Sequence, residues 1–334
     1  MTPHWGWRLA SQSSLCYSPR MPPLRIVSLL PSATEILFAL GLGDQVVGVS
    51  HECDFPLEAR NRKVVIHSRI PTDAAPAEID RLVRESSARG ESVYSVDAEV
   101  LRSLSPDLIV TQDLCHVCAA SPEDLAAVLR NCDLRPEVLC LNPLELGDVW
   151  RDILWVGEQT FHAHAAEKLL AGIGERLGAL DEQIENTSER PSVAFLEWLQ
   201  PVYVGGHWVP EMIALAGARD AFSMPRTPSF RVTLDEVVAA QPDILVVAPC
   251  GYNSEQARNE YRSIDFPDGW TEIPAVRNGR VYFLDANSYF SRPGPRLTTG
   301  LEILAKLFHP ELKASFAAES IVAPMLGVAR SATA

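Results

Sequence analysis

Short apolar segments alternate with segments of helical periodicity along most of the chain. Residues 26–30 form an apolar, partly β-branched run, and a helical pattern over 35–40 follows it and stops at Gly41. The same order returns later, where an apolar run over 192–197 precedes a helical pattern over 210–216. Strands that alternate with helices are typical of βαβ units, which build a mainly parallel sheet with helices on its faces. The pattern predicts an α/β fold.

The two halves of the chain repeat one another at fixed offsets. In each half a glutamate lies six residues before a glycine, and an acidic residue lies seven residues before a proline that introduces a strand. The equivalent positions are Glu35 and Glu211, Gly41 and Gly217, Glu99 and Asp235, and Pro106 and Pro242. Together these offsets indicate an internal repeat. We therefore predict two related Rossmann-like lobes with mainly parallel sheets, an N-terminal lobe over 24–146 and a C-terminal lobe over 189–312.

A segment without proline, 147–186, lies between the predicted lobes and carries apolar residues at helical spacing. It predicts one long interlobe α-helix over 147–188. A helix of forty residues would span about 60 Å, which is more than a crossover between neighbouring strands needs. Gly157 and three further glycines each cost about 1 kcal/mol relative to alanine in a helix. A kink or break is therefore the alternative to a single rigid helix.

The two ends of the chain lack the patterns of the lobes. Residues 1–34 contain no acidic residue, and the first twenty lack the apolar stretch of a secretory signal. We expect residues 1–23 to be disordered, or to be a mis-annotated start with translation beginning at Met21, and 313–334 to form a tail. The expected location is cytoplasmic, or periplasmic or extracellular if the start is mis-annotated.

Charge and cysteine content narrow the class of protein. The 334 residues carry a formal net charge of −14, which opposes binding to nucleic acids and to anionic lipid surfaces. No run approaches the roughly 18–20 apolar residues of a membrane-spanning helix, so we expect no membrane insertion. The seven cysteines are few for this length and odd in number, which does not indicate a disulfide framework.

Candidate ligand contacts follow from the predicted sheets, because ligands of open parallel sheets collect beyond the carboxyl ends of the strands. The loops there are aromatic and glycine-rich in the second lobe, as expected of a concave site for a large, partly flat ligand. Ordinary packing at the edge of the sheet is the alternative. The candidates are Ser32, His51, Glu52, Cys53, Cys115 and His116 in the first lobe, and Trp198, Tyr203, His207, Trp208, Tyr289 and Phe290 in the second.

Cysteines and histidines of the first lobe suggest a second chemistry. Cys115 and Cys118 flank His116 within one turn, a spacing suited to a soft metal or to thiol exchange. His51 and Cys53 could join Cys115 and Cys118 as four ligands of a zinc or iron ion. The alternative is that these are small buried residues without a ligand.

Signatures of enzymes are missing from the sequence. It contains no phosphate-binding loop of the form G-x-x-x-x-G-K-[ST], no H-E-x-x-H and no G-x-S-x-G. A hydrolase or transferase using Glu52, Asp54 or Glu197 as acid or base has no motif to support it. We therefore predict that the protein is not an enzyme.

Two segments carry a resemblance to a known family. They are 25–37, RIVSLLPSATEIL, and 41–56, GLGDQVVGVSHECDFP. Over about 24–312 the sequence resembles the periplasmic-binding-protein family for cobalamin and iron-siderophore uptake, the helical-backbone class of ABC transporter substrate-binding proteins, and most of all its cobalamin-binding branch. The resemblance implies two α/β lobes bridged by a long helix, and a largely preformed cleft that binds its ligand without chemistry.

The resemblance also implies a ligand and a partner. The ligand would be cobalamin or a related corrinoid, with His51, His116 or His207 reaching cobalt, or instead an iron-siderophore or haem. An ABC permease would dock on Glu99 and Asp235, with Glu236 able to replace Asp235, and the protein would be a monomer.

Two departures from the family suggest an intracellular offshoot. They are the absence of a signal and the presence of cysteines and histidines at the cleft. The competing hypothesis is a metal-binding or thiol-redox protein on the same scaffold, using Cys53, Cys115 and Cys118.

Overall fold

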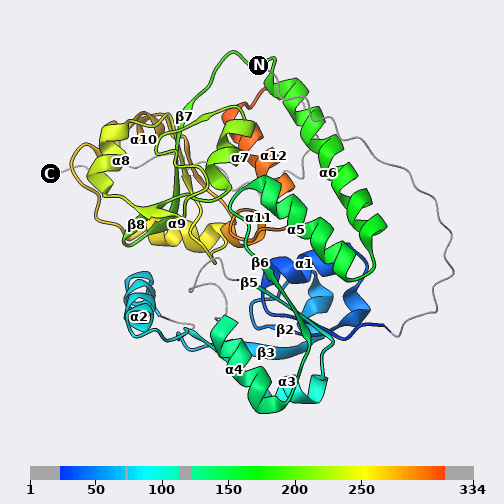
Figure 1. The fold of residues 1–334 in the computed structure, drawn as a ribbon. Coiled ribbons are helices and arrows are strands. Elements are labelled where there is room, and N and C mark those ends of the chain that lie inside the picture. The colour runs from blue at the N-terminus through cyan, green and yellow to red at the C-terminus, as the bar shows by residue number, and fades with distance from the viewer. Residues whose placement is uncertain (1–22, 72–73, 113–121, 313–334) are drawn as a thin grey trace.

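The computed structural model describes residues 23–71, 74–112 and 122–312, which form two α/β lobes (Figure 1). The sheet of the first lobe has the strand order β4-β3-β2-β1-β5-β6, and its neighbours are parallel except for β3 and β4. Its strands are β1 (Ile26–Ser28), β2 (Val46–Ser50), β3 (Lys63–Ser68), β4 (Tyr94–Val96), β5 (Leu108–Gln112) and β6 (Glu137–Leu141). Its helices are α1 (Pro31–Ala39), α2 (Pro76–Ala88), α3 (Ala98–Leu104) and α4 (Pro122–Cys132).

The second lobe is built around the strand order β10-β8-β7-β11-β12, with β9 paired to β7. The strands are β7 (Ser192–Leu199), β8 (Val202–Val204), β9 (Arg219–Asp220), β10 (Phe230–Arg231), β11 (Ile244–Val247) and β12 (Val281–Phe283). The helices are α7 (Val209–Leu215), α8 (Leu234–Ala240), α9 (Ser254–Arg262), α10 (Pro274–Arg277), α11 (Ala286–Tyr289) and α12 (Leu297–Phe308). Short 3-10 helices lie at Gly43–Gln45, Leu57–Asn61 and Trp270–Glu272. The predicted two-lobe α/β fold is confirmed.

The internal repeat reappears as equivalent backbone contacts in the two lobes. Asp107 accepts a hydrogen bond of 2.8 Å from the backbone N–H of Arg25, and Asp243 accepts one of 2.8 Å from the N–H of Ser192. Each aspartate therefore fixes the residue at or just before the start of its lobe's first strand. The glycines after α1 and α7 share a left-handed conformation, with φ of 80° and 83°. These positions need glycine because a side chain there would be strained.

Two packed helices, α5 (Leu146–Gln159) and α6 (Ala163–Ile184), connect the lobes. The expectation of one helix over 147–188 is wrong in its extent, because the chain turns at 160–162. Phe161 lies in that turn with φ of 61° and most of its surface exposed. Gly157 allows the two helices to meet, since a side chain on it would collide with Ala166. The connecting helix is α6, whose 22 residues span about 33 Å at 1.5 Å per residue.

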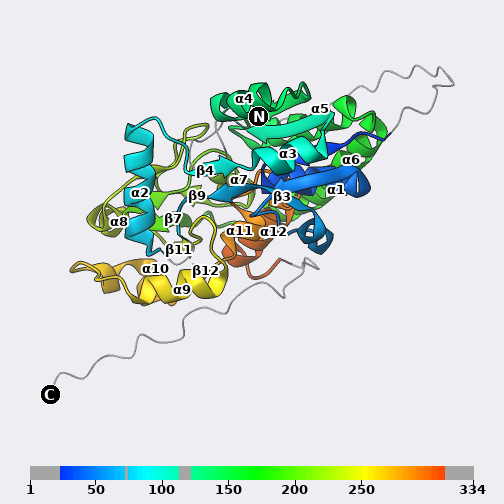
Figure 2. The ribbon, with the colours of Figure 1, turned by 90° about the horizontal axis from the view of Figure 1, so that it is seen from below.

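Apolar side chains of both sheets and their helices form the cores. Phe195, Phe283 and Phe290 are among the large side chains with almost no exposed surface. A second view shows α2 beside the second lobe, although the chain places it between β3 and β4 of the first (Figure 2). The surface between the two lobes is thus bounded by α5 and α6 on one side and by α2 on the other (Figure 1).

Candidate functional site

Buried charges join the two lobes at the base of the region between them. Glu35 on α1 is 2% exposed and accepts two hydrogen bonds from Arg296, of 2.5 and 2.8 Å. Arg292 lies 3.4 Å from the same carboxylate. Burial raises the pKa of Glu35, and the two guanidinium groups offset part of that rise. This cluster holds the first helix of one lobe against the loop before α12 of the other.

Residues after β2 extend this contact toward the surface. Arg292 pairs with Asp54 at 2.5 Å and donates a hydrogen bond of 3.0 Å to the carbonyl of Glu52. Asn287 lies 3.5 Å from the carboxylate of Asp54, and Arg296 stacks over the ring of Phe55 at 4.1 Å from its centroid. The loop that starts at the end of β2 is therefore fixed by the second lobe.

The repeat supplies an equivalent contact in the reverse direction. Glu211 on α7 accepts a hydrogen bond of 2.9 Å from the backbone N–H of Leu146, the first residue of α5. Burial raises the pKa of Glu211. Next to it, Glu145 pairs with Arg226 of the second lobe at 2.5 Å. The glutamates that the offsets identified as equivalent, Glu35 and Glu211, thus each contact the start of a helix that lies beyond their own lobe.

Two of the predicted residues of the first lobe, His51 and Glu52, are exposed at the end of β2, as a ligand contact requires. The Nδ1 atom of His51 lies 3.1 Å from the carbonyl oxygen of Ile66. Because a carbonyl only accepts, Nδ1 carries a proton in this contact, and in the neutral ring the lone pair is then on Nε2. Nε2 is 3.9 Å from the carboxylate of Glu52. His51 therefore presents Nε2 at an exposed position at the end of β2.

Ser32 and Cys53 are buried instead. The sulfur of Cys53 lies 3.0 Å from the hydroxyl of Thr34, within hydrogen-bond distance, and the same hydroxyl lies 2.8 Å from that of Ser28. Burial raises the pKa of Cys53 to about 11, so the thiol stays protonated at neutral pH. Since the thiolate is the form that binds metals and exchanges disulfides, Cys53 gives no support to the metal or thiol-redox hypothesis.

The remaining members of the predicted metal set lie outside the described residues. These are Cys115 and Cys118, together with the candidate ligand contact His116. Among residues 23–71, 74–112 and 122–312, no group of three or more histidines, cysteines or acidic residues could hold a metal ion.

Aromatic side chains of the second lobe divide into exposed and buried ones. Trp198, Tyr203 and Tyr289 are half-buried. Trp198 meets Tyr252 edge to face at 5.6 Å, and the backbone N–H of Asn287 lies 3.4 Å from the carbonyl of Tyr252. These contacts connect the aromatic pair to the charged cluster through Asn287, which also faces Asp54.

Two of the predicted aromatic contacts belong to the core. Trp208 and Phe290 are 4% and 1% exposed, and the indole of Trp208 donates a hydrogen bond of 2.8 Å to the carbonyl of Phe290. Phe290 also packs edge to face on Phe195. The prediction that these two residues contact a ligand is wrong, because their side chains point into the second lobe.

His207 and the loop opposite it form a tight part of the second lobe. His207 is half-buried with φ of 50°, and burial lowers the pKa of its ring, so the imidazole is neutral near pH 7. Its backbone N–H donates to the carbonyl of Thr227 at 2.7 Å. Gly206 touches the same loop so closely that a side chain there would collide with the backbone of Ser229. The hydroxyl of Ser229 in turn bonds to Glu197 at the end of β7.

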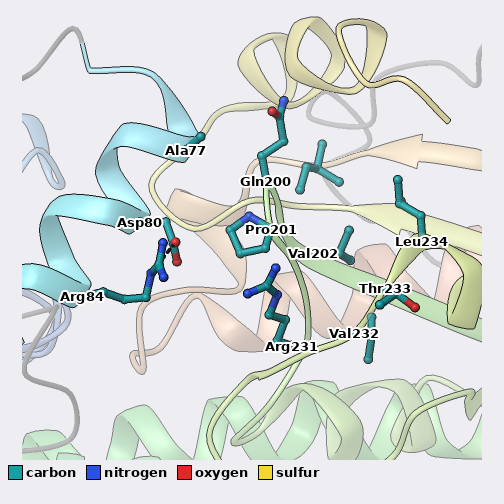
Figure 3. A pocket seen from close by; sticks show the side chains of 11 residues that line it. Ala77, Asp80, Arg84, Gln200, Pro201, Val202, Arg231, Val232, Thr233 and Leu234 are labelled. Atoms are coloured by element: carbon teal, nitrogen blue, oxygen red, sulfur yellow. Dashed lines mark hydrogen bonds and ion pairs between the residues drawn. The ribbon is translucent and has the colours of Figure 1, made fainter.

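A groove of about 430 Å³ opens between α2 and the second lobe (Figure 3). Its lining is mixed, with apolar walls and three charged side chains, Asp80, Arg84 and Arg231. The lining residues are Ala77, Asp80, Arg84, Leu199, Gln200, Pro201, Val202, Arg231, Val232, Thr233 and Leu234. Neither α2 nor this groove was predicted from the sequence, although the amphipathic pattern over 76–88 indicates a helix there.

The predicted docking residues occupy equivalent positions. Glu99 is the second residue of α3, after the N-cap Asp97, and Asp235 is the second residue of α8, after the N-cap Thr233. Both carboxylates are exposed. Glu236 instead closes a capping box, accepting 2.7 and 2.9 Å bonds from the backbone and hydroxyl of Thr233. Asp235 is therefore better placed than Glu236 to face a partner.

The cross-lobe residues Arg292, Arg296 and Asn287 were not among the predicted site residues. One signal could have found the cluster, namely that Glu35 lies in an otherwise apolar helical segment. A buried carboxylate needs cationic partners. Arg292 lies in the loop before α12, and Arg296 is the N-cap residue of that helix.

Known proteins resemble this chain along most of its length. An ABC transporter substrate-binding lipoprotein of Bacillus subtilis, YvrC, is 28% identical over 86% of this chain and 81% of its own. A vitamin B12-binding protein of Vibrio parahaemolyticus is 24% identical over 82% and 86%. The periplasmic heme-binding protein RhuT of Roseiflexus superposes with a TM-score of 0.64, at 24% identity over 86% and 99%. The structural likeness supports the fold.

These relatives overturn the expected location. YvrC is named an ABC transporter substrate-binding lipoprotein, and the family whose model matches residues 26–288 is described as periplasmic binding protein, and both descriptions belong outside the cytoplasm. The expectation of a cytoplasmic protein, and with it that of an intracellular offshoot, is therefore wrong. Within the part of the chain that the structure describes, none of the helices has the length and apolar character to cross a membrane.

The family comparison covers both lobes and the helices between them. Residues 26–288 match the family described as periplasmic binding protein, from the first strand of the first lobe to α11 of the second. Two lobes with mostly parallel sheets and a connecting helix agree with this match. The chain therefore belongs to the periplasmic binding protein family, a family of substrate-binding transport proteins.

Proposed function

We propose that this protein binds cobalamin or a related corrinoid between its two lobes and delivers it to an ABC permease outside the cytoplasm. The observation that carries the proposal is the meeting of the loop after β2 with the aromatic loops of the second lobe. His51 and Glu52 are exposed on one side, and Trp198 and Tyr252 form an edge-to-face pair on the other. A flat macrocycle needs apolar area on its faces and polar groups at its edge.

Relatives favour a corrinoid over the other ligands of this fold. A protein named vitamin B12-binding covers 82% of this chain. The heme-binding relative shares the fold at 24% identity, so haem stands as the second candidate. The charged base of the site favours neither, because Glu35 and Asp54 neutralise Arg292 and Arg296 within the protein.

His51 is the best placed of the described histidines to reach cobalt. Its Nδ1–H is held by the carbonyl of Ile66, which orients the ring and directs Nε2, the ligand atom of the neutral tautomer, to an exposed position. His207 is neutral as well, but its Nε2 is buried without a hydrogen-bond partner among the described residues. We therefore assign axial ligation to His51 in this proposal.

The first experiment is a titration of the purified protein with hydroxocobalamin, followed by calorimetry and by the visible spectrum. Saturable binding at one site with a shifted corrin spectrum supports the proposal, and haemin and a ferric hydroxamate are titrated in parallel. Tight binding of haemin without binding of hydroxocobalamin would refute the corrinoid assignment. In His51→Ala we expect the spectral shift to be lost while binding persists.

An aromatic substitution with a matched control tests the position of the ligand. Trp198→Ala removes a half-buried ring between the lobes, whereas Trp155→Ala removes one that is 36% exposed on α5. Stacking on an aromatic ring is worth about 0.5–1.5 kcal/mol beyond its buried area. We expect corrinoid affinity to fall at least about tenfold in Trp198→Ala and to stay unchanged in Trp155→Ala.

We propose further that a monomer docks on the permease through Glu99 and Asp235. Their equivalent positions on α3 and α8 present one carboxylate from each lobe. Glu99→Gln combined with Asp235→Asn should abolish ligand uptake by cells that carry the permease while leaving ligand affinity unchanged. Glu189→Gln, an exposed carboxylate beside β7, is the control. Uptake that survives the double substitution would contradict this docking site.

A further inference from the structure

The groove between α2 and the second lobe has an excess of positive charge. Asp80 and Arg84 pair with each other across one turn of α2, with 2.8 Å between the Arg84 Nε and a carboxylate oxygen. Arg231 has no acidic side chain beside it among the residues that line the groove, so the lining carries a net charge of +1. The protein as a whole carries −14. A cationic groove on an acidic protein favours an anion locally.

The lining also suits an anion that is attached to a larger apolar ligand. Figure 3 shows the Arg231 side chain directed toward Pro201, with Arg84 on the facing helix. Val202, Val232 and Leu234 form the apolar part of the wall. A guanidinium group binds a phosphate or carboxylate through two parallel hydrogen bonds. A volume of about 430 Å³ lies near the small end of the range for ligand pockets, so the groove fits a substituent rather than a whole macrocycle.

We infer that Arg231, with Arg84 across the groove, recognises an oxyanion at the periphery of the ligand that binds between the lobes. For a corrinoid the oxyanion is the phosphodiester of the nucleotide loop, and for haem it is a propionate. The inference rests on the proposed function and deepens it, since it assigns the part of the ligand that the groove selects. Because α2 comes from the first lobe and Arg231 from the second, the oxyanion would contact both lobes.

Cobalamin and cobinamide test this inference, because cobinamide has the corrin ring but lacks the nucleotide loop and its phosphodiester. Dissociation constants are measured for both ligands with the wild type and with Arg231→Gln. We expect Arg231→Gln to weaken cobalamin binding by at least about tenfold and to leave cobinamide binding nearly unchanged. Arg130→Gln, which changes the charge of the protein equally on exposed α4, should change neither constant.

A substitution of opposite sign sharpens the test. Asp80→Asn removes the carboxylate that pairs with Arg84 and so raises the positive charge of the groove. We expect it to strengthen cobalamin binding and to leave cobinamide binding unchanged. If each substitution changed the dissociation constants of cobalamin and cobinamide by the same factor, the inference would be overturned, while the proposed corrinoid function would stand.

If the wild type binds neither corrinoid, the proposed function fails and the groove is tested with other probes. Haemin and its dimethyl ester then form the pair, since esterification removes the carboxylates, and a loss in Arg231→Gln that is confined to haemin supports the groove. If neither of these binds, inorganic pyrophosphate is titrated. Binding that Arg231→Gln abolishes supports the inference, and a wild type that does not bind pyrophosphate overturns it.

Discussion

Removing one partner of the buried ion pair of Glu35 with Arg296 should destabilise the protein far more than removing one partner of a surface pair of the same geometry. Glu35 is 2% exposed and the Arg296 side chain 18%, and two hydrogen bonds of 2.5 and 2.8 Å join them. Removing one partner of a buried pair costs about 3–5 kcal/mol, because the other charge stays buried without compensation. Arg292 remains near Arg296 after Glu35→Gln, so two cations would then face each other. We expect a loss of about 3 kcal/mol in the free energy of unfolding.

A double-mutant cycle isolates the interaction from other effects of the substitutions. The free energy of unfolding in urea is measured for Glu35→Gln, Arg296→Gln, the double variant and the wild type. We expect a coupling energy of about 2–3 kcal/mol, at the upper end for residues in contact. The control is the pair of Glu78 and Arg81 on exposed α2, which has bonds of 2.6 and 2.8 Å. Its coupling should be much smaller because solvent screens it.

We attribute the larger coupling energy of Glu35 and Arg296 to burial rather than to distance. Equal coupling energies in the two pairs would refute it, since their distances are nearly the same. A coupling energy below about 0.5 kcal/mol for Glu35 and Arg296 would also refute it, because that is the range of independent residues. In the second case the other contacts between the lobes, such as those of Arg292 with Asp54 and of Glu211 with Leu146, would hold them together.

The burial or close packing of three residues, Glu260, Cys53 and Gly206, leads to three further predictions. Burial raises the pKa of Glu260 to about 7 from 4.5, so protonation favours the folded state at low pH. That advantage is lost as the pH rises from about 4.5 through 7. The free energy of unfolding of the wild type, measured in urea, should therefore fall by up to about 3 kcal/mol between pH 5 and pH 8, and this fall should be absent in Glu260→Gln. Cys53, with its pKa near 11, should be alkylated by iodoacetamide at pH 8 far more slowly than exposed Cys250, and equal rates by mass spectrometry would contradict its burial. Gly206→Ala should cost about 1–3 kcal/mol in thermal unfolding because it displaces the facing loop, whereas Gly172→Ala on open α6 should stabilise the protein slightly.

Local signals in the sequence were sufficient for the lobes and their repeat. Gly41 and Gly217 end equivalent helices because each adopts a left-handed conformation that only glycine takes without strain. Asp107 and Asp243 introduce equivalent strands because each caps the backbone of its lobe's first strand region. These interactions act within one lobe and repeat at fixed offsets, so the sequence alone could reveal them.

Features that depend on contacts between distant parts of the chain could not be predicted. The break between α5 and α6 arises where Gly157 lets two helices pack, and the same glycine is also compatible with one continuous helix. Arg292 and Glu35 are 257 positions apart, so no local pattern relates them. Trp208 and Phe290 were misplaced because a loop position does not reveal which way a side chain points.

The contacts between the lobes at their base affect how the protein would select its ligand. Glu35 and Glu211 each fasten one lobe to the start of a helix beyond it, and α5 and α6 pack along the same side. A wide hinge motion would have to break a buried ion pair, so we expect most of the proposed binding surface to be formed before the ligand arrives. The charged residues at the base pair with one another and are not available to a ligand. We therefore expect the outer part of the site to discriminate between ligands. There α2 brings Arg84 opposite Arg231, and the groove they line is where a corrinoid with a nucleotide loop would be distinguished from one without it.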